Sequence, residues 1–179
     1  PRSIPEKRSE IERRLAAELP FEEPVEIPLC ISTPAWMLVI EAVYKGNLRR
    51  HTTFDARRDA VLRLLDTASA VAAGAHQQLY TVIVCTDPRT LNLETAKLVE
   101  RYRGHGERLA EMLPHRQDTT VLAAAADNLA LVRWRDLGAL VLEIKAEARL
   151  GQFDVAVVDE LIKYLGRKEI GFNFFRRLK

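Results

Sequence analysis

The chain has 179 residues, of which 47% are hydrophobic and 29% are charged, and its formal net charge is only +2. This composition excludes a disordered or fibrous protein, and the near-neutral charge gives no general argument for nucleic-acid binding. The length fits one domain that can bury a sizeable core.

The two cysteines, Cys30 and Cys85, both lie in apolar runs, where buried free thiols commonly occur. They are too few for a disulfide framework or a zinc site, which favours a reducing, cytoplasmic compartment. No apolar run approaches the roughly 18 residues that cross a bilayer, so no membrane partner is expected. Basic clusters such as Arg49-Arg50-His51 and Arg57-Arg58 are typical of solvated surface.

The first 24 residues are predicted to form a helix, 5–19, followed by a proline-rich connector. Apolar residues recur every four positions along this helix, and Pro20 ends it. Pro28 restricts any strand between Val25 and Ile31 to the edge of a sheet, because proline lacks the N–H that a central strand needs. The next apolar run, Ala35–Tyr44, suits either a helix or a buried strand.

The clearest helix is expected between a cap at Thr52 or Thr53 and Gly74, within an N-terminal portion of the domain that spans residues 25–91. Its apolar residues have helical spacing and are expected to face the core: Val61, Leu64, Leu65, Ala68 and Ala72. Its charged residues are expected to face solvent: Arg57, Arg58, Asp59 and Arg63. The next segment, Leu79–Cys85, is predicted to be a strand because branched and aromatic residues fill it.

Residues 92–179 form a second group of predicted elements. A helix capped by Asn92 is expected to bury Thr95, Leu98, Val99 and Tyr102, and a further apolar stripe that stops at Pro114 indicates a kink or two short helices. The run Thr119–Ala124 is interpreted as a strand. The segment 153–165 is predicted to be a helix, and the alternation from Ile170 a last strand. Three residues of that helix are expected to face inward: Val157, Leu161 and Leu165.

The segment Ala125–Ala146 is interpreted as a β-hairpin. One apolar run ends at Trp134, a polar turn containing a glycine follows, and a second apolar run ends in Glu143-Ile144-Lys145. Because side chains alternate between the two faces of a strand, Glu143 and Lys145 are expected to share one face. Asp127 would then lie at the head of the partner strand.

Taken in order from Asn92, these elements are helix, strand, strand, strand, helix, strand. With its acidic residues, this order resembles the common core of the PD-(D/E)xK nuclease superfamily. In that family an acidic residue begins the second core strand and a Glu-x-Lys sits on the third, and here Asp127 and Glu143-Ile144-Lys145 take those places. The resemblance implies an α/β domain with a mixed, partly antiparallel sheet flanked by helices and an αβββαβ core in its C-terminal half.

The same resemblance implies a metal-dependent nuclease or phosphodiesterase that acts on nucleic acid. Asp127 and Glu143 would hold Mg²⁺ or Mn²⁺ through their carboxylate oxygens, which are hard ligands. Lys145 would be the catalytic residue that orients the nucleophile or stabilises developing charge. A glutamate of the first core helix often joins the site in this family, and three residues are candidates for that role: Glu100, Glu107 and Glu111.

Three other interpretations stay open. Glu143 and Lys145 also suit the solvent side of a half-exposed antiparallel strand, with Arg133 as the cross-strand partner of Glu143. A non-catalytic binding or assembly domain of a larger complex, with other protein subunits as partners, would use its basic helix and C-terminal surface, and it predicts an exposed apolar patch. A small-ligand module would have its pocket near Asp87, at the end of the strand Leu79–Cys85.

Overall fold

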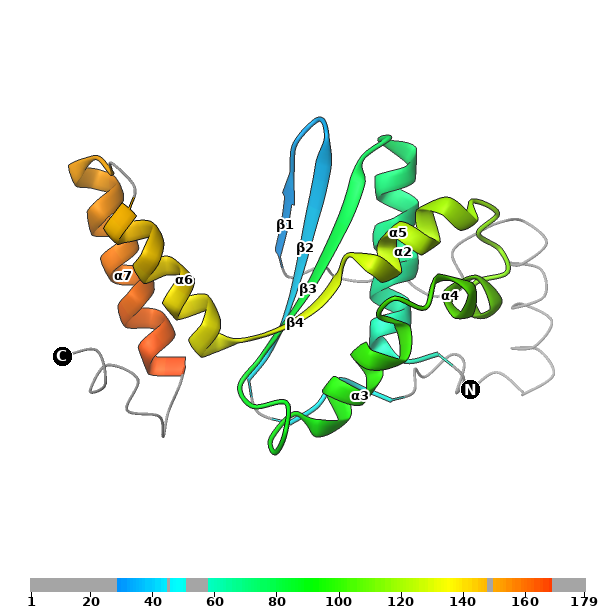
Figure 1. Cartoon of the computed structure of the whole chain (residues 1–179), viewed down its shortest axis with the longest axis horizontal. Coiled ribbons are helices and arrows are strands. Elements are labelled where there is room, and N and C mark those ends of the chain that lie inside the picture. The colour runs from blue at the N-terminus through cyan, green and yellow to red at the C-terminus, as the bar shows by residue number, and fades with distance from the viewer. Residues whose placement is uncertain (1–28, 45, 51–57, 148–149, 169–179) are drawn as a thin grey trace, which may run out of the picture.

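The computed structural model describes residues 29–44, 46–50, 58–147 and 150–168 (Figure 1). Within these residues, four strands form one sheet in the order β1-β2-β3-β4. Their bounds are Leu29–Ser32 for β1, Trp36–Val43 for β2, Gln78–Cys85 for β3 and Leu129–Arg133 for β4. β1 pairs antiparallel with β2, whereas the other two pairings are parallel. The expected class, a single α/β domain with a mixed sheet flanked by helices, is therefore confirmed.

Helices cover both faces of the sheet, so the molecule has three layers (Figure 1). One face is covered by α2 (Ala60–Gly74), α3 (Leu93–Tyr102), α4 (Gly106–Met112) and α5 (Thr119–Asp127). The other face is covered by a helical hairpin of α6 (Trp134–Glu147) and α7 (Gln152–Lys168). The main core lies under α2–α5, and a smaller core lies under the hairpin. No helix within the described ranges is long and apolar enough to cross a membrane.

The ambiguous run 35–44 is a strand, β2. Met37, Val39 and Val43 alternate into the main core, while Ile40 packs on the opposite side against the smaller core. A strand whose two faces are both covered has a nearly continuous apolar sequence, which explains why periodicity alone did not distinguish it from a helix.

α2 confirms the predicted apolar stripe, since all five of its residues are buried. The helix begins after Asp59, whose side chain accepts a hydrogen bond from the backbone amide of Leu62 at 2.9 Å. The expectation that Arg58 and Asp59 face solvent is wrong, because they are only 4% and 0% exposed. The expected cap at Thr52 or Thr53, helix 5–19, Arg57 and the strand from Ile170 lie outside the described residues.

The expected αβββαβ core of the C-terminal half is wrong. The run Thr119–Ala124 belongs to α5, because alanine is the best helix former and the Asp118 side chain caps the helix through two backbone amides. Of the first half of the expected hairpin, residues 125–127 belong to α5 and Leu129–Arg133 form a strand, β4. The second half is α6, whose buried residues follow the spacing of one helix face, namely Trp134, Gly138 and Val141.

α7 confirms the helix that was predicted over 153–165, but not the face expected to point inward. Leu165 is buried as expected, whereas Val157 and Leu161 are 51% and 40% exposed. Val158 and Ile162 pack against the smaller core instead. The helix is therefore rotated by about one residue from the expected orientation, which leaves a second apolar face outside.

Candidate functional site

The three residues expected to form a metal site lie on two helices. Asp127 is the last residue of α5, and Glu143 and Lys145 are on α6. Residues two apart in an α-helix differ by about 200° around its axis, so the expectation that Glu143 and Lys145 share one face is wrong. The Lys145 ammonium contacts the Asp159 carboxylate of α7 at 2.5 Å.

Binding of Mg²⁺ or Mn²⁺ at Asp127 and Glu143 stays a prediction, but the strand geometry on which it rested is absent. Among the described residues, no group of three or more His, Cys, Asp or Glu side chains is arranged to hold a metal ion. Arg133, expected to pair with Glu143, instead binds Asp136 through two hydrogen bonds of 2.6 and 2.7 Å. This pair braces the junction between β4 and α6.

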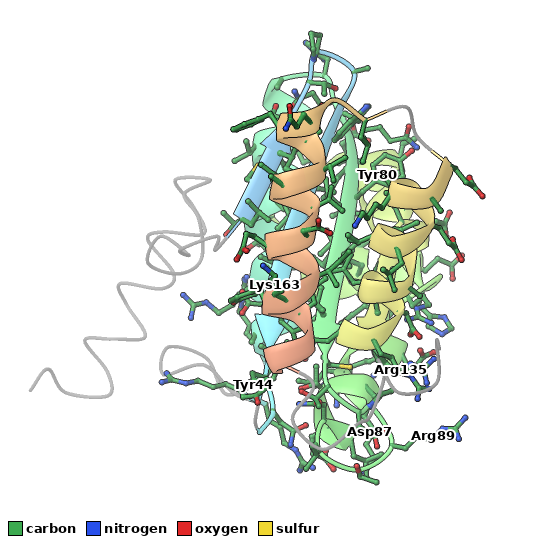
Figure 2. The ribbon with its side chains drawn as sticks, turned by 90° about the vertical axis from the view of Figure 1, so that its left-hand side faces the viewer. Tyr44, Tyr80, Asp87, Arg89, Arg135 and Lys163 are labelled. Carbon is green, nitrogen blue, oxygen red and sulfur yellow. The ribbon has the colours of Figure 1, made fainter. Side chains whose placement is uncertain are left out.

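The carboxyl ends of the parallel strands lie together at one end of the sheet, where α/β proteins commonly bind ligands. Figure 2 shows Tyr44, Asp87, Arg89 and Arg135 gathered at this end. However, α2 and α3–α5 connect successive parallel strands across the same face. The order of the described strands therefore does not reverse, and the topology by itself creates no crevice here.

Asp87 is engaged in shaping the loop between β3 and α3. Its carboxylate accepts hydrogen bonds from the Arg89 amide at 2.9 Å and the Thr90 hydroxyl at 2.8 Å, and these bonds lower its pKa. The side-chain oxygen of Asn92 holds the same loop by accepting from the amides of Thr86 and Asp87 at 2.9 and 3.0 Å. These polar groups form hydrogen bonds within the loop itself, which weakens the argument that Asp87 binds a ligand.

Cys85 is a structural thiol. It is 0% exposed, and burial together with the negative charge of Asp87 raises its pKa to about 11. The thiol is therefore protonated at neutral pH, where a nucleophile would need to be a thiolate. Cys30, which was expected to be buried as well, is exposed on the edge strand β1.

The α6–α7 hairpin carries large apolar side chains on its outside. On α7, four of them recur at i, i+4, i+8 and i+11, the spacing of one helix face. Exposure reaches 78% at Phe153 and 51% at Val157. Two residues of α6 are about half exposed as well, and we call the exposed apolar residues of the two helices the outer stripe: Leu140, Ile144, Phe153, Val157, Leu161 and Tyr164.

The charges around the outer stripe are balanced. α6 carries three acidic and two basic residues, and α7 carries three of each, so the net charge of the two helices is −1. Two ion pairs already neutralise part of this surface, Lys145–Asp159 between the helices and Lys163–Glu160 within α7. A nearly neutral surface lacks the basic excess that phosphate contacts require.

Asp66 lies in a buried polar network on the opposite layer. Its carboxylate accepts hydrogen bonds from Arg58 at 2.6 Å and from Arg116 at 2.7 Å, and it lies 3.0 Å from the His115 ring. Burial alone would raise the pKa of Asp66, but the hydrogen bonds from His115, Arg58 and Arg116 outweigh it and hold the pKa far below its usual range.

A cavity of about 270 Å³ adjoins this network. It lies between α2, α5 and the loop that precedes α5, and both polar and apolar side chains line it. The lining residues are Ser69, Ala70, Ala73, His115, Arg116, Gln117, Asp118, Val121 and Leu122.

Neither the outer stripe nor the buried network was identified from the sequence. The apolar residues of α7 include both Val157 and Val158, and both Leu161 and Ile162, which is more than one buried helix face requires. That excess was the available signal for a second apolar face. No family model, curated protein or solved structure matches the chain, so the assignment of function rests on this geometry.

Proposed function

We propose that this protein is a non-catalytic assembly domain that self-associates through the outer stripe of the α6–α7 hairpin. The observation that carries the proposal is the exposure of six large apolar side chains along two adjacent helices. The four of α7 lie along one face of that helix and expose apolar surface on the order of 400 Å², comparable with the largest patches of ordinary monomers, which are often functional. A patch of this size can form the apolar centre of a specific interface, which buries about 800 Å² on each partner.

The charge of the hairpin favours a second copy of the chain as the partner. A copy brings the same balanced charges, so two hairpins approach without net repulsion, whereas nucleic acid requires a basic surface. From Phe153 to Tyr164 the outer stripe rises about 16 Å along α7, or three helical turns. Two hairpins related by a two-fold axis would bury this stripe in a four-helix contact.

Measuring the mass of the full chain in solution tests this proposal. Sedimentation equilibrium between about 1 and 200 μM should show a reversible change from the 20.3 kDa monomer to a species of twice that mass. Leu161→Glu should shift the change to higher concentration, because a carboxylate would be buried in the contact. A wild-type chain that stays monomeric over this range would overturn the proposal.

A metal-dependent nuclease or phosphodiesterase is the second candidate, and one observation favours it. β1, β2, α2 and β3 run strand, strand, helix, strand, which are the last four elements of the order expected for the nuclease family. Glu41 on β2 is half-buried, and burial raises its pKa. However, Val43 stands where Glu-x-Lys has its lysine, and β1 contains no acidic residue. These departures favour a nuclease-like fold without catalysis.

Cleavage of labelled DNA and RNA in Mn²⁺ or Mg²⁺ separates the two candidates. The assembly proposal expects no cleavage by the wild-type chain or by any of its variants. Cleavage by the wild type that is lost in Glu143→Ala or Lys145→Ala would establish the site expected on α6. Loss in Glu41→Gln alone would instead place a catalytic site at β2.

A further inference from the structure

We infer that the cavity between α2 and α5 is a binding site for a small organic carboxylate with a short aliphatic tail. The cavity holds about 270 Å³, which is close to the smallest ligand pockets. Arg116, Ser69 and the apolar side chains that line the same cavity carry the inference. It is independent of the self-association proposed for the hairpin.

The charge beside the cavity favours an anion. The guanidinium group of Arg116 lines the cavity, and the Asp66 carboxylate that it contacts is shared with Arg58. A guanidinium group in the wall of a partly enclosed site attracts an anionic ligand. Asp118 also lines the cavity, but its Oδ1 already accepts from the amides of Thr120 and Val121 at the start of α5.

Arg116 supplies the donors for a carboxylate. Its Nε donates to Asp66 at 2.7 Å, which fixes the plane of the guanidinium group. The two terminal nitrogens have no partner among the described residues, and the side chain is 23% exposed. A guanidinium edge of this kind binds a carboxylate through two parallel hydrogen bonds.

Ser69 supplies a second polar group on the α2 side. It is only 2% exposed and lines the cavity, yet its hydroxyl has no hydrogen-bond partner among the described residues. A buried hydroxyl without a hydrogen-bond partner destabilises the protein. A ligand oxygen that accepts a hydrogen bond from it would remove this cost. The hydroxyl therefore favours a ligand with an acceptor oxygen at this position.

The apolar part of the lining favours a ligand with an aliphatic tail. Four side chains present only carbon atoms to the cavity: Ala70 and Ala73 of α2, and Val121 and Leu122 of α5. Alanines leave the space that a tail of about three to five carbons would fill. Inorganic phosphate would use the polar groups alone and leave these four side chains without contacts.

Titration of the full chain with butanoate and hexanoate, followed by amide chemical shifts in NMR, tests the assignment. We expect saturable shifts in residues 69–73 and 116–122, with a dissociation constant on the order of 0.1–1 mM for hexanoate. Hexylamine should not bind, and inorganic phosphate should bind at least about tenfold more weakly. Equal binding of hexylamine or of phosphate, or no saturable shift with hexanoate, would overturn the inference.

Matched variants distinguish a binding role from a structural one. Ser69→Ala and Arg116→Gln should each weaken hexanoate at least about fivefold, and Ser69→Ala should leave stability unchanged or raised because the lost hydroxyl is unpaired. Thr81→Val is the control: Thr81 is 0% exposed and does not line the cavity, and its hydroxyl likewise has no hydrogen-bond partner in the part of the chain that the structure describes. Unchanged affinity in Ser69→Ala and Arg116→Gln, or the same loss in Thr81→Val, would contradict the assignment.

Discussion

Leu161 and Ile162 are consecutive residues of α7 that face different surroundings. Ile162 packs against the smaller core over the sheet, whereas Leu161 is 40% exposed. One helix therefore carries two apolar faces, and the sheet covers only one of them. The proposal of an assembly domain assigns the second face to another copy of the chain.

Tyr102→Phe tests the bond that ties α3 to the start of α2. The Tyr102 hydroxyl donates to Asp59 at 2.7 Å, and both residues are fully buried. Removing a donor from a buried carboxylate should lower the free energy of unfolding by about 1.5–3 kcal/mol in urea denaturation. Tyr80→Phe is the control, with an expected change under about 0.5 kcal/mol, because Tyr80 is 37% exposed. Equal losses in the two variants would contradict this account.

Asp66→Asn tests the buried network and its dependence on pH. Because the folded pKa of Asp66 is depressed, its carboxylate stabilises the fold above the unfolded-state pKa of about 4, and this contribution is lost as the pH falls further. The variant should lose about 3 kcal/mol at pH 7, with a shallower decline in stability below pH 4. Asp159→Asn, which breaks a half-exposed pair, should cost under about 1 kcal/mol. A decline with pH as steep as that of the wild type would count against the network.

Thiol labelling tests the burial of Cys85. At pH 8 a thiol with a pKa of about 11 is almost entirely protonated, and Cys85 is also inaccessible, whereas Cys30 is exposed. One thiol should therefore react rapidly with iodoacetamide in the native chain, and both should react in denaturant. Cys30→Ser should abolish the fast reaction, and its persistence would show that Cys85 is accessible.

Gly106→Ala tests the packing of α4 against α5. A Cβ at this position would lie 2.7 Å from the Cα of Ala123, so one helix would have to move. We expect a loss of about 1–3 kcal/mol in urea denaturation. Gly74→Ala at the end of α2 meets nothing within 4 Å, and it should be neutral or slightly stabilising. An equally mild effect at both positions would mean that the two helices are less closely packed.

The parts of the fold that depend on local sequence were predictable. The strand 79–85 and the buried stripe of α2 were expected from residue type and spacing, and the structure confirms both. The prediction of a hairpin over 125–146 was wrong because a segment rich in large apolar residues, such as Leu140–Ile144 with its single Glu143, fits a strand and one face of a helix equally well. The helix is favoured over a strand because it buries Trp134 and Val141 on one face. That burial depends on the sheet against which the helix packs.

The polar network depends on contacts between distant parts of the chain. Asp66 meets Arg58 across 8 residues, but it meets His115 and Arg116 across 49 and 50. The spacing of charges at the start of α2 therefore predicted solvent exposure for Arg58, although its partner Asp66 is buried by contacts with His115 and Arg116 from the loop before α5. The orientation of α7 was missed for a similar reason, since only the sheet selects which of its two apolar faces is buried.

A matched pair of valines tests the central claim of self-association most directly. Val157 in the outer stripe and Val71 on α2 are 51% and 52% exposed, and each lies on a helix, but on opposite layers of the molecule. Sedimentation equilibrium of the full-length variants should show that Val157→Glu raises the dimer dissociation constant at least about 30-fold, while Val71→Glu leaves it unchanged. Equal dissociation constants for the two variants would contradict the assignment of the outer stripe as the assembly surface.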